Sequence, residues 1–266
     1  MFTERSLSPA LDAVREEHAP GALVVDVERD FETLPPEVAE ELSLLTDSLD
    51  LLTYPSEWVP ADAPQPLHRL AGGEFTVGMP GDGGVTWTRQ TDPPVVFVKA
   101  RMEGSPESFV DFLVAEALVQ AGLDLPEHFL GFFEDRYPDL AAATGDRLDP
   151  AGTYQLAAAL YEAYVGLHTR PVFEGWDSTR PALYDAWADA GQRLRPRLAD
   201  LASEVATGQT DFSAAAELAC AAVKHAGDSA DAVAIPTPFR ALDSPAYLEY
   251  GADFAVQWAE KTFEKL

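Results

Sequence analysis

The chain has 266 residues, of which 47% are hydrophobic and 10% aromatic, so it can bury a sizeable core and belongs among globular proteins. It carries 45 acidic and 18 basic residues, a formal net charge of -27, and this balance argues against nucleic-acid binding because a phosphate backbone is repelled. No run of about 18 apolar residues occurs, so no membrane-spanning helix is predicted.

The acidic residues are spread along the chain, without a block of about five like charges. A distributed charge favours a surface adapted to molar salt, where self-repulsion is screened, over a dedicated acidic patch. Asparagine is absent and isoleucine occurs only as Ile235. The composition resembles that of haloarchaea that keep molar salt inside the cell. The start of the chain lacks the apolar segment of a secretory signal, so a cytoplasmic location is predicted.

The first part of the chain mixes helical and extended patterns. Ser8, followed by a proline, is a typical N-cap and predicts a helix over 9–18. Alternating apolar residues predict a strand at 23–27, and an amphipathic pattern predicts a helix over 35–49. Four prolines interrupt residues 54–66, which are therefore predicted to form a loop.

Two alternating runs, 75–79 and 85–88, flank an Asp-Gly turn at 82–83 and predict an antiparallel hairpin. The next run, 95–101, is apolar on both faces at its start, which is typical of a central strand. The end of this run contains Lys99, one of only four lysines, and Arg101, which lie on the same face of the predicted strand.

Helical patterns dominate the remainder of the sequence. Helices are predicted at 106–121, 126–136, 150–168, 181–206 (interrupted at Pro196), 211–226 and 245–265. Three of them follow a residue that is a good N-cap and is itself followed by proline, namely Ser105, Asp149 and Ser244. Asp124 and Glu127 form a near capping box at the start of another.

This order of elements predicts an α+β fold. We expect a small mixed or antiparallel sheet in residues 1–102, followed by a helical part in residues 103–266. The connections are short, so the two parts are predicted to form a single domain over 1–266. Cys220, the only cysteine, lies among alanines and is predicted to be a buried small side chain instead of a reactive thiol.

The helix predicted after Ser105 is apolar around most of its circumference, which is typical of a buried helix. Glu116 falls on its apolar stripe, beside Phe112 and Leu113. A carboxylate there is costly unless it is paired, hydrogen-bonded or protonated. Two interpretations stay open: Glu116 is a structural tie or lies at the edge of the stripe, or it is a catalytic acid or base.

The second interpretation comes from spacing. Zinc proteases carry H-E-x-x-H on a helix, often followed by x-x-G, because two histidines one turn apart share a metal ion. Here AEALVQAG keeps Glu116 and Gly122 but has Ala115 and Val119 at the histidine positions. The segment resembles a degenerate zincin scaffold, and the resemblance implies a scaffold without metal that is reused for binding. No metal and no other cofactor is predicted.

Three further residues could assist Glu116, namely His128, Glu162 and His168. Each histidine lies alone on an aromatic face, which more often indicates a core or helix-end histidine than a ligand. Glu162 lies on a face with small and polar neighbours, which is typical of a solvated or close-packed surface. The aromatic stripe of the last helix, which includes Tyr247, predicts either core or a surface for homo-oligomer formation.

The segments FETLPPEVAEEL, TVGMPGDGGVTWTRQTDPPV and LPEHFLGFFEDRYPDL resemble an uncharacterised haloarchaeal family, a domain of unknown function. The resemblance covers most of the chain and implies no activity, substrate or partner. The first functional hypothesis is therefore a non-catalytic binding or interaction protein. The alternative is a hydrolase-like enzyme that uses Glu116 as general acid or base, and a third is a purely structural subunit. Common lining of one cavity by Glu116 and its candidate partners would favour the enzyme.

Overall fold

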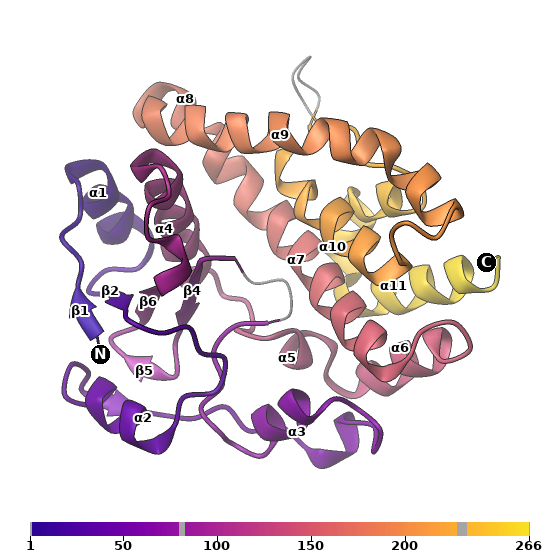
Figure 1. Cartoon of the computed structure of the whole chain (residues 1–266), viewed down its shortest axis with the longest axis horizontal. Helices are drawn as coiled ribbons and strands as arrows, with labels where there is room; N and C mark the ends of the chain where they lie inside the picture. Colours follow the sequence, from indigo (N-terminus) through magenta and orange to yellow (C-terminus); the bar gives the residue numbers. More distant parts are fainter. Residues whose placement is uncertain (1, 80–82, 228–232, 266) are drawn as a thin grey trace. The chain divides into compact units, whose positions relative to one another are not determined.

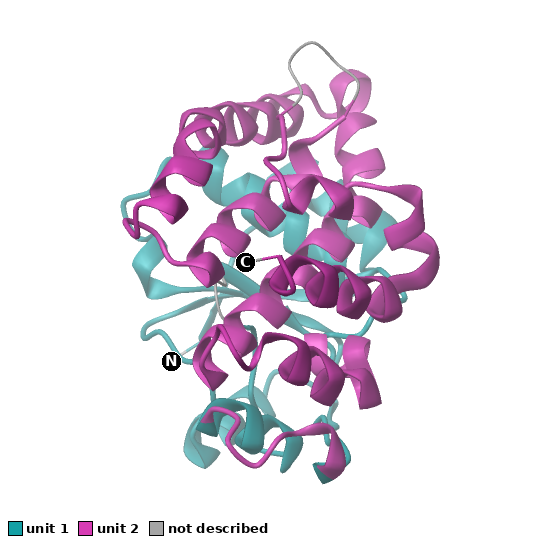
Figure 2. Ribbon diagram, turned by 90° about the vertical axis from the view of Figure 1, so that its right-hand side faces the viewer, with its two compact units in different colours: residues 1–56, 65–128 teal, residues 57–64, 129–266 magenta. Residues whose placement is uncertain are grey.

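The computed structural model describes residues 2–79, 83–227 and 233–265. The chain divides into two compact units, coloured separately in Figure 2. Unit 1 comprises residues 1–56 and 65–128, and unit 2 comprises 57–64 and 129–266. The α+β class is confirmed, since the strands lie in the N-terminal part and helices follow. The prediction of a single domain stays a prediction.

Unit 1 contains the strands and the helices that surround them. Its elements are β1 (Phe2–Glu4), α1 (Pro9–His18), β2 (Leu23–Val27), α2 (Pro36–Leu42), β3 (Ser48–Leu49), α3 (Gln65–Ala71), β4 (Val85–Thr88), β5 (Thr91–Asp92), β6 (Val95–Val98), the 3-10 turn η2 (Ala100–Met102) and α4 (Glu107–Ala121). The 3-10 turn η1 (Ser56–Trp58) contains the point at which the chain passes from unit 1 to unit 2.

The main sheet has the order β1-β2-β6-β4 (Figure 1). β2 and β6 are parallel, and β1 and β4 pair antiparallel to them at the edges. All four residues of β6 are buried, which confirms the prediction of a central strand. A parallel pair needs a long crossover, and here the crossover contains α2, α3 and β4.

The two faces of this sheet are covered by different helices (Figure 1). Val95 and Phe97 of β6 point to one face, where they form a core with α2 and with residues 75–77. Val96 lies on the other face beside Trp87, its partner in the register. The Trp87 indole donates a hydrogen bond to Gln120 of α4 at 2.9 Å, and α4 packs against α1 on this side.

Two predictions in the crossover are wrong. β4 pairs with β6, while residues 75–77 run beside 32–34, so the predicted hairpin does not form. The turn predicted at 82–83 lies partly outside the described residues. The helix predicted over 35–49 ends at Leu42. The end of the predicted segment is extended instead, because β3 pairs with β5 in a second, two-stranded sheet.

The regular elements of unit 2, among its described residues, are all helices or 3-10 turns. Its elements are α5 (Phe129–Phe133), η3 (Glu134–Arg136), α6 (Tyr137–Thr144), α7 (Pro150–Glu174), α8 (Trp176–Thr179), α9 (Pro181–Ala206), α10 (Phe212–Ala221), η4 (Val223–His225), η5 (Phe239–Leu242) and α11 (Pro245–Phe263). Asp149 and Ser244 cap α7 and α11 as predicted, each accepting a backbone N–H with its side chain.

Proline and glycine act differently in these helices from the prediction. α9 continues through Pro196, and the carbonyl group that proline leaves without a partner belongs to the exposed Gln192, where water can reach it. α7 likewise runs beyond the predicted end, through Pro171. α11 is kinked at Gly251, which has a φ of 48°.

Candidate functional site

A cavity of about 620 Å³ opens in unit 1 at the carboxyl ends of β2 and β6. After β2 the chain leads to α2 on one face of the sheet, and after β6 it leads to α4 on the opposite face. Diverging connections leave a crevice between two parallel strands, and ligands bind at such switch points in open α/β sheets. We call this cavity the strand-end crevice.

The inner wall of the crevice is apolar. Val27 and Val98, at the ends of the two parallel strands, are buried there together with Met102 of η2 and Val110 of α4. The Met102 side chain packs closely over Gly84, where a Cβ atom would overlap the Met102 sulfur. The turn after β6 therefore packs against the residue that precedes β4.

Charged groups lie both inside the crevice and around it. Lys99 is only 3% exposed, and its backbone N–H donates to the Gly84 carbonyl at 2.7 Å. The Arg5 guanidinium donates to the Asp26 carboxylate at 2.6 Å, an ion pair between β2 and the segment after β1. Neighbouring Arg101 instead pairs with Asp30 at 3.2 Å and is not part of the lining.

Three exposed carboxylates complete the lining, Glu28 after β2, Glu103 after η2 and Glu107 at the start of α4. Burial and the nearby charge of Glu107 raise the pKa of Asp111, one turn along α4, while Arg5 opposes this rise. The crevice thus combines buried and partly buried cationic groups with three exposed carboxylates, which we call the acidic rim.

Ser105 also lines the crevice, and its predicted role as N-cap is wrong. α4 begins at Glu107, its N-cap is Pro106, and no side-chain hydrogen bond caps it. The Ser105 backbone N–H donates to the Met102 carbonyl at 3.0 Å, which belongs to the turn before the helix. Pro106 has a φ of -55°, which suits a helix, but an extended ψ of 132°, so the helix starts one residue later than predicted.

Glu116 lies in the middle of α4 and is 6% exposed. Gln120 Nε2 lies 3.5 Å from Glu116 Oε1, and Gln120 in turn accepts the Trp87 indole N–H. Ala115 and Val119, at the metal-ligand positions of the zincin pattern, are fully buried. Glu116 is not among the residues that line the strand-end crevice.

Gly122, the other residue kept from the zincin pattern, has a packing role. A Cβ atom at this position would overlap the backbone carbonyl oxygen of His18, at the end of α1. The backbone of Gly122 is in the right-handed helical region, so the contact alone requires glycine. The close approach of α1 and α4 accounts for this residue without a metal site.

Glu127 holds together a polar cluster that the capping-box pattern did not predict. Its carboxylate accepts hydrogen bonds from Thr88 Oγ1 at 2.7 Å, the Arg89 backbone N–H at 2.7 Å and Gln90 Nε2 at 2.8 Å. Burial raises the pKa of Glu127, although these hydrogen bonds and the Arg89 charge oppose the rise. Burial and the Glu127 charge also raise the pKa of Tyr54.

The other candidate residues are divided between the units. His128 belongs to unit 1, is 3% exposed, and its pKa is lowered by burial to about 3, so it is neutral at pH 7. Glu162 and His168 belong to unit 2. Burial lowers the pKa of His168, whose ring lies edge-on to Tyr164 at 4.8 Å between centroids.

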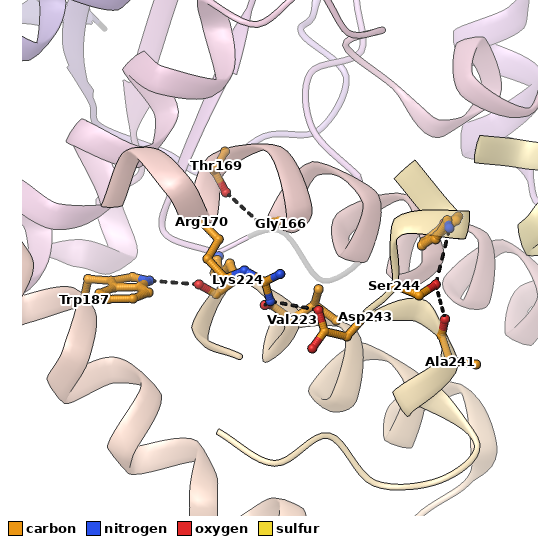
Figure 3. A network of polar contacts seen from close by, with 10 residues as sticks. Gly166, Thr169, Arg170, Trp187, Val223, Lys224, Ala241, Asp243 and Ser244 are labelled. Atoms are coloured by element: carbon orange, nitrogen blue, oxygen red, sulfur yellow. Dashed lines mark hydrogen bonds and ion pairs between the residues drawn. The ribbon is translucent and has the colours of Figure 1, made fainter. Parts of the chain in front are cut away.

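Glu162 is part of a network around η4, shown in part in Figure 3. The Lys224 ammonium donates to Glu162 at 3.1 Å. Arg170 of α7 donates to the Val223 carbonyl at 3.2 Å and to the Asp243 carboxylate at 2.8 Å. The Trp187 indole N–H donates to the Lys224 carbonyl at 3.1 Å. We call this group of contacts the η4 network.

The sequence also pointed to Cys220 and to the aromatic stripe of the last helix. Cys220 is 1% exposed, and burial raises the pKa of its thiol, so the prediction of a buried side chain is confirmed. In the aromatic stripe of α11, Tyr247 and Trp258 are buried, whereas Tyr250 is 57% exposed. Homo-oligomer formation through this stripe stays a prediction.

Within residues 2–79, 83–227 and 233–265, no group of three or more His, Cys, Asp or Glu side chains could hold a metal ion. No described helix combines the length and apolar character needed to cross a membrane.

The sequence model of the protein family DUF7089, described as a family of unknown function, matches residues 1–266. The chain therefore belongs to this family. Comparison with curated proteins gave no match, and comparison with solved structures gave none either.

Proposed function

We propose that this member of DUF7089 is a non-catalytic protein that binds a small polar ligand in the strand-end crevice. The observation that carries the proposal is a cavity of about 620 Å³ at a switch point of the sheet, with the buried Lys99 in its lining. Small-molecule sites are concave, have volumes of roughly 300–1,000 Å³, and combine apolar walls with a few placed polar groups.

Binding is better supported than nucleophilic catalysis by the chemistry of the lining. Among the described residues of the crevice there is no histidine or cysteine, and Ser105 supplies the one hydroxyl group. A serine nucleophile needs a base within hydrogen-bond reach, most often a histidine, and the described lining offers only Lys99 and carboxylates for that role. The charged groups that are present can orient a ligand.

The test is a screen for bound small molecules. The chain is equilibrated with a metabolite extract in about 3 M KCl, where an acidic surface is screened, and retained compounds are identified by mass spectrometry. Ser105→Trp places a bulky side chain in the lining and is expected to abolish retention. Ser108→Trp, on the exposed first turn of the same helix, is the matched control and is expected to retain the compounds. Retention unchanged by Ser105→Trp, or no retention at all, would contradict the proposal.

The proposal includes a setting, the cytoplasm of a salt-accumulating haloarchaeon. A formal net charge of -27 supports this because such a charge destabilises a folded chain unless salt screens it. The free energy of unfolding is therefore expected to rise steadily with KCl concentration up to the molar range. A stability that is highest in dilute buffer would count against the halophilic setting.

The alternative function is a hydrolase-like enzyme on a degenerate zincin-like scaffold, with Glu116 as general acid or base. The burial of this carboxylate on an apolar helix is the observation in its favour. The test compares Glu116→Gln with the parent chain in hydrolase assays. Loss of an activity by this variant, with the fold and crevice binding unchanged, would favour the enzyme over the binding protein.

A further inference from the structure

The charged side chains of the strand-end crevice differ in burial according to their sign. Lys99 is almost fully buried in the lining, and Arg5 is partly buried with its partner Asp26. Glu28, Glu103 and Glu107 are exposed. Positive charge is therefore the more buried part of the lining, and negative charge is the more exposed part.

The interior selects a ligand with an anionic group. An ammonium has three N–H donors, so Lys99 can keep a contact with the protein and still donate to a ligand oxygen. Arg5 shares its charge between Asp26 and the nearby Asp111, so it adds less positive potential than a free guanidinium. One carboxylate is well matched to such an interior, because hydrogen bonds to a charged acceptor are among the stronger ones.

The rim selects against a ligand that is only anionic. Three exposed carboxylates line the crevice, and their charge repels an approaching anion. A phosphate or a dicarboxylate would meet this repulsion without compensation. A ligand that also carries an ammonium group would instead gain from Glu28 and Glu103.

The lining also has an apolar part. Val27, Val98, Met102 and Val110 are buried and provide the inner wall of the crevice. Burial of an aliphatic group against such a wall contributes about 25 cal/mol for each Å² removed from water. The wall therefore favours a ligand with an aliphatic body between its charged groups or attached beside them.

We propose that the strand-end crevice binds a zwitterion of the amino-acid class, with its carboxylate toward Lys99, its ammonium toward the acidic rim and an aliphatic body against the inner wall. This inference rests on the proposed function and specifies its ligand.

The experiment compares free leucine with its two halves, 4-methylpentanoate, which lacks the ammonium, and 3-methylbutylamine, which lacks the carboxylate. Inorganic phosphate is the fourth probe. Binding to the full chain is measured by titration calorimetry in about 1 M KCl, where distant charges are screened. Leucine is expected to bind at least tenfold more tightly than either half, and phosphate to give no heat. Equal affinity for leucine and 4-methylpentanoate, or binding of phosphate, would overturn the inference.

Two variants test which side chains bind the carboxylate and the ammonium of leucine. Lys99→Met is expected to remove the preference for leucine over 3-methylbutylamine, and Glu28→Gln with Glu103→Gln to remove the preference over 4-methylpentanoate. Since Lys99 is buried, its replacement could prevent folding, and the comparison of the three probes on the parent chain then decides the question. If none of the probes binds while the metabolite screen yields a compound sensitive to Ser105→Trp, the zwitterion is wrong and the binding function stands. If the screen also fails, both proposals fall.

Discussion

The strand-end crevice and the η4 network contain the same kinds of charged side chains in different settings. In the network the charges pair with one another, whereas several charges of the crevice line a cavity. In the η4 network, Lys224 is bound to Glu162. Arg170 is bound to Asp243 and to the Val223 carbonyl (Figure 3). These contacts join α7 to η4 and to Asp243. The crevice also contains an ion pair, Arg5 with Asp26, but its lining of Lys99 and three exposed carboxylates borders an open volume.

The difference shows where a function is best sought in this chain. Titratable groups with shifted pKa values cluster at functional sites, but structural ion-pair networks shift them as well. His225 and Glu127 illustrate the structural case, because the first is packed on an indole ring and the second is saturated with hydrogen bonds. An open volume lined by charge is the better criterion here, and four substitutions or changes of condition test it.

Acidification is expected to have the largest effect, through the η4 network. His225 is 6% exposed and stacks on Trp187 at 5.6 Å between centroids, and burial with the Lys224 charge lowers its pKa to about 3. In the unfolded chain its pKa is about 6.5, so the unfolded state binds the proton first. The stability that neutral His225 contributes is complete above pH 6.5 and is lost as the pH falls toward 3. At about pH 4.5 the loss is about 3 kcal/mol.

The measurement is denaturant unfolding in high KCl near pH 7.5 and near pH 4.5, for the parent chain and His225→Leu. The substitution itself changes the free energy of unfolding at pH 7.5. This change cancels when each protein is compared with itself at the two pH values. The variant is expected to lose less stability on acidification than the parent. Parallel losses in both proteins would show that His225 is protonated in the folded state.

Gly122→Ala is expected to have the next largest effect, on unit 1. The added Cβ would overlap the His18 carbonyl, a backbone atom that cannot rotate away, so α1 and α4 must move apart. Overpacking of this kind costs typically about 1–3 kcal/mol of unfolding free energy. Gly83→Ala is the matched control, because a Cβ atom there meets nothing within 4 Å. Equal stability of the two variants would contradict the close approach of the helices.

The contrast between Gly122 and the capped helices indicates how far the sequence could lead. Caps are local, so Ser8, Asp149 and Ser244 could be predicted from a few neighbouring residues. The contact of Gly122 with His18 joins residues far apart in the chain, and a spacing pattern suggested a metal-site remnant instead. The central position of β6 followed from its apolar run.

The strand-end crevice could not be predicted for the same reason. It requires that β2 and β6 pair in parallel and that their following segments leave on opposite faces, and neither fact has a local signal. Lys99 was visible only as a rare cation at a strand end. Glu127 was also misinterpreted, because its three hydrogen-bond donors come from Thr88, Arg89 and Gln90, nearly forty residues earlier, and a capping box describes only neighbours.

Glu162→Gln is expected to have a smaller effect than either change above. It removes the charge that Lys224 meets at 3.1 Å but keeps the size of the side chain. The two side chains are 31% and 14% exposed, so water can partly replace the lost interaction. We expect a loss of about 1 kcal/mol in the free energy of unfolding, measured by denaturant titration. A variant as stable as the parent would mean that the η4 network does not depend on this pair.

Glu103→Gln applies the same chemical change to the strand-end crevice and is expected to have the smallest effect on stability. Glu103 is exposed at the rim, and surface substitutions of this kind change the free energy of unfolding by less than about 0.5 kcal/mol. The affinity of the Glu103→Gln variant for free leucine is expected to fall, whereas the Glu162→Gln variant is expected to bind leucine as tightly as the parent chain. If Glu103→Gln instead destabilises the chain as much as Glu162→Gln, the rim carboxylate serves the fold, and the distinction between charge that closes a structure and charge that faces a ligand would not hold for this residue.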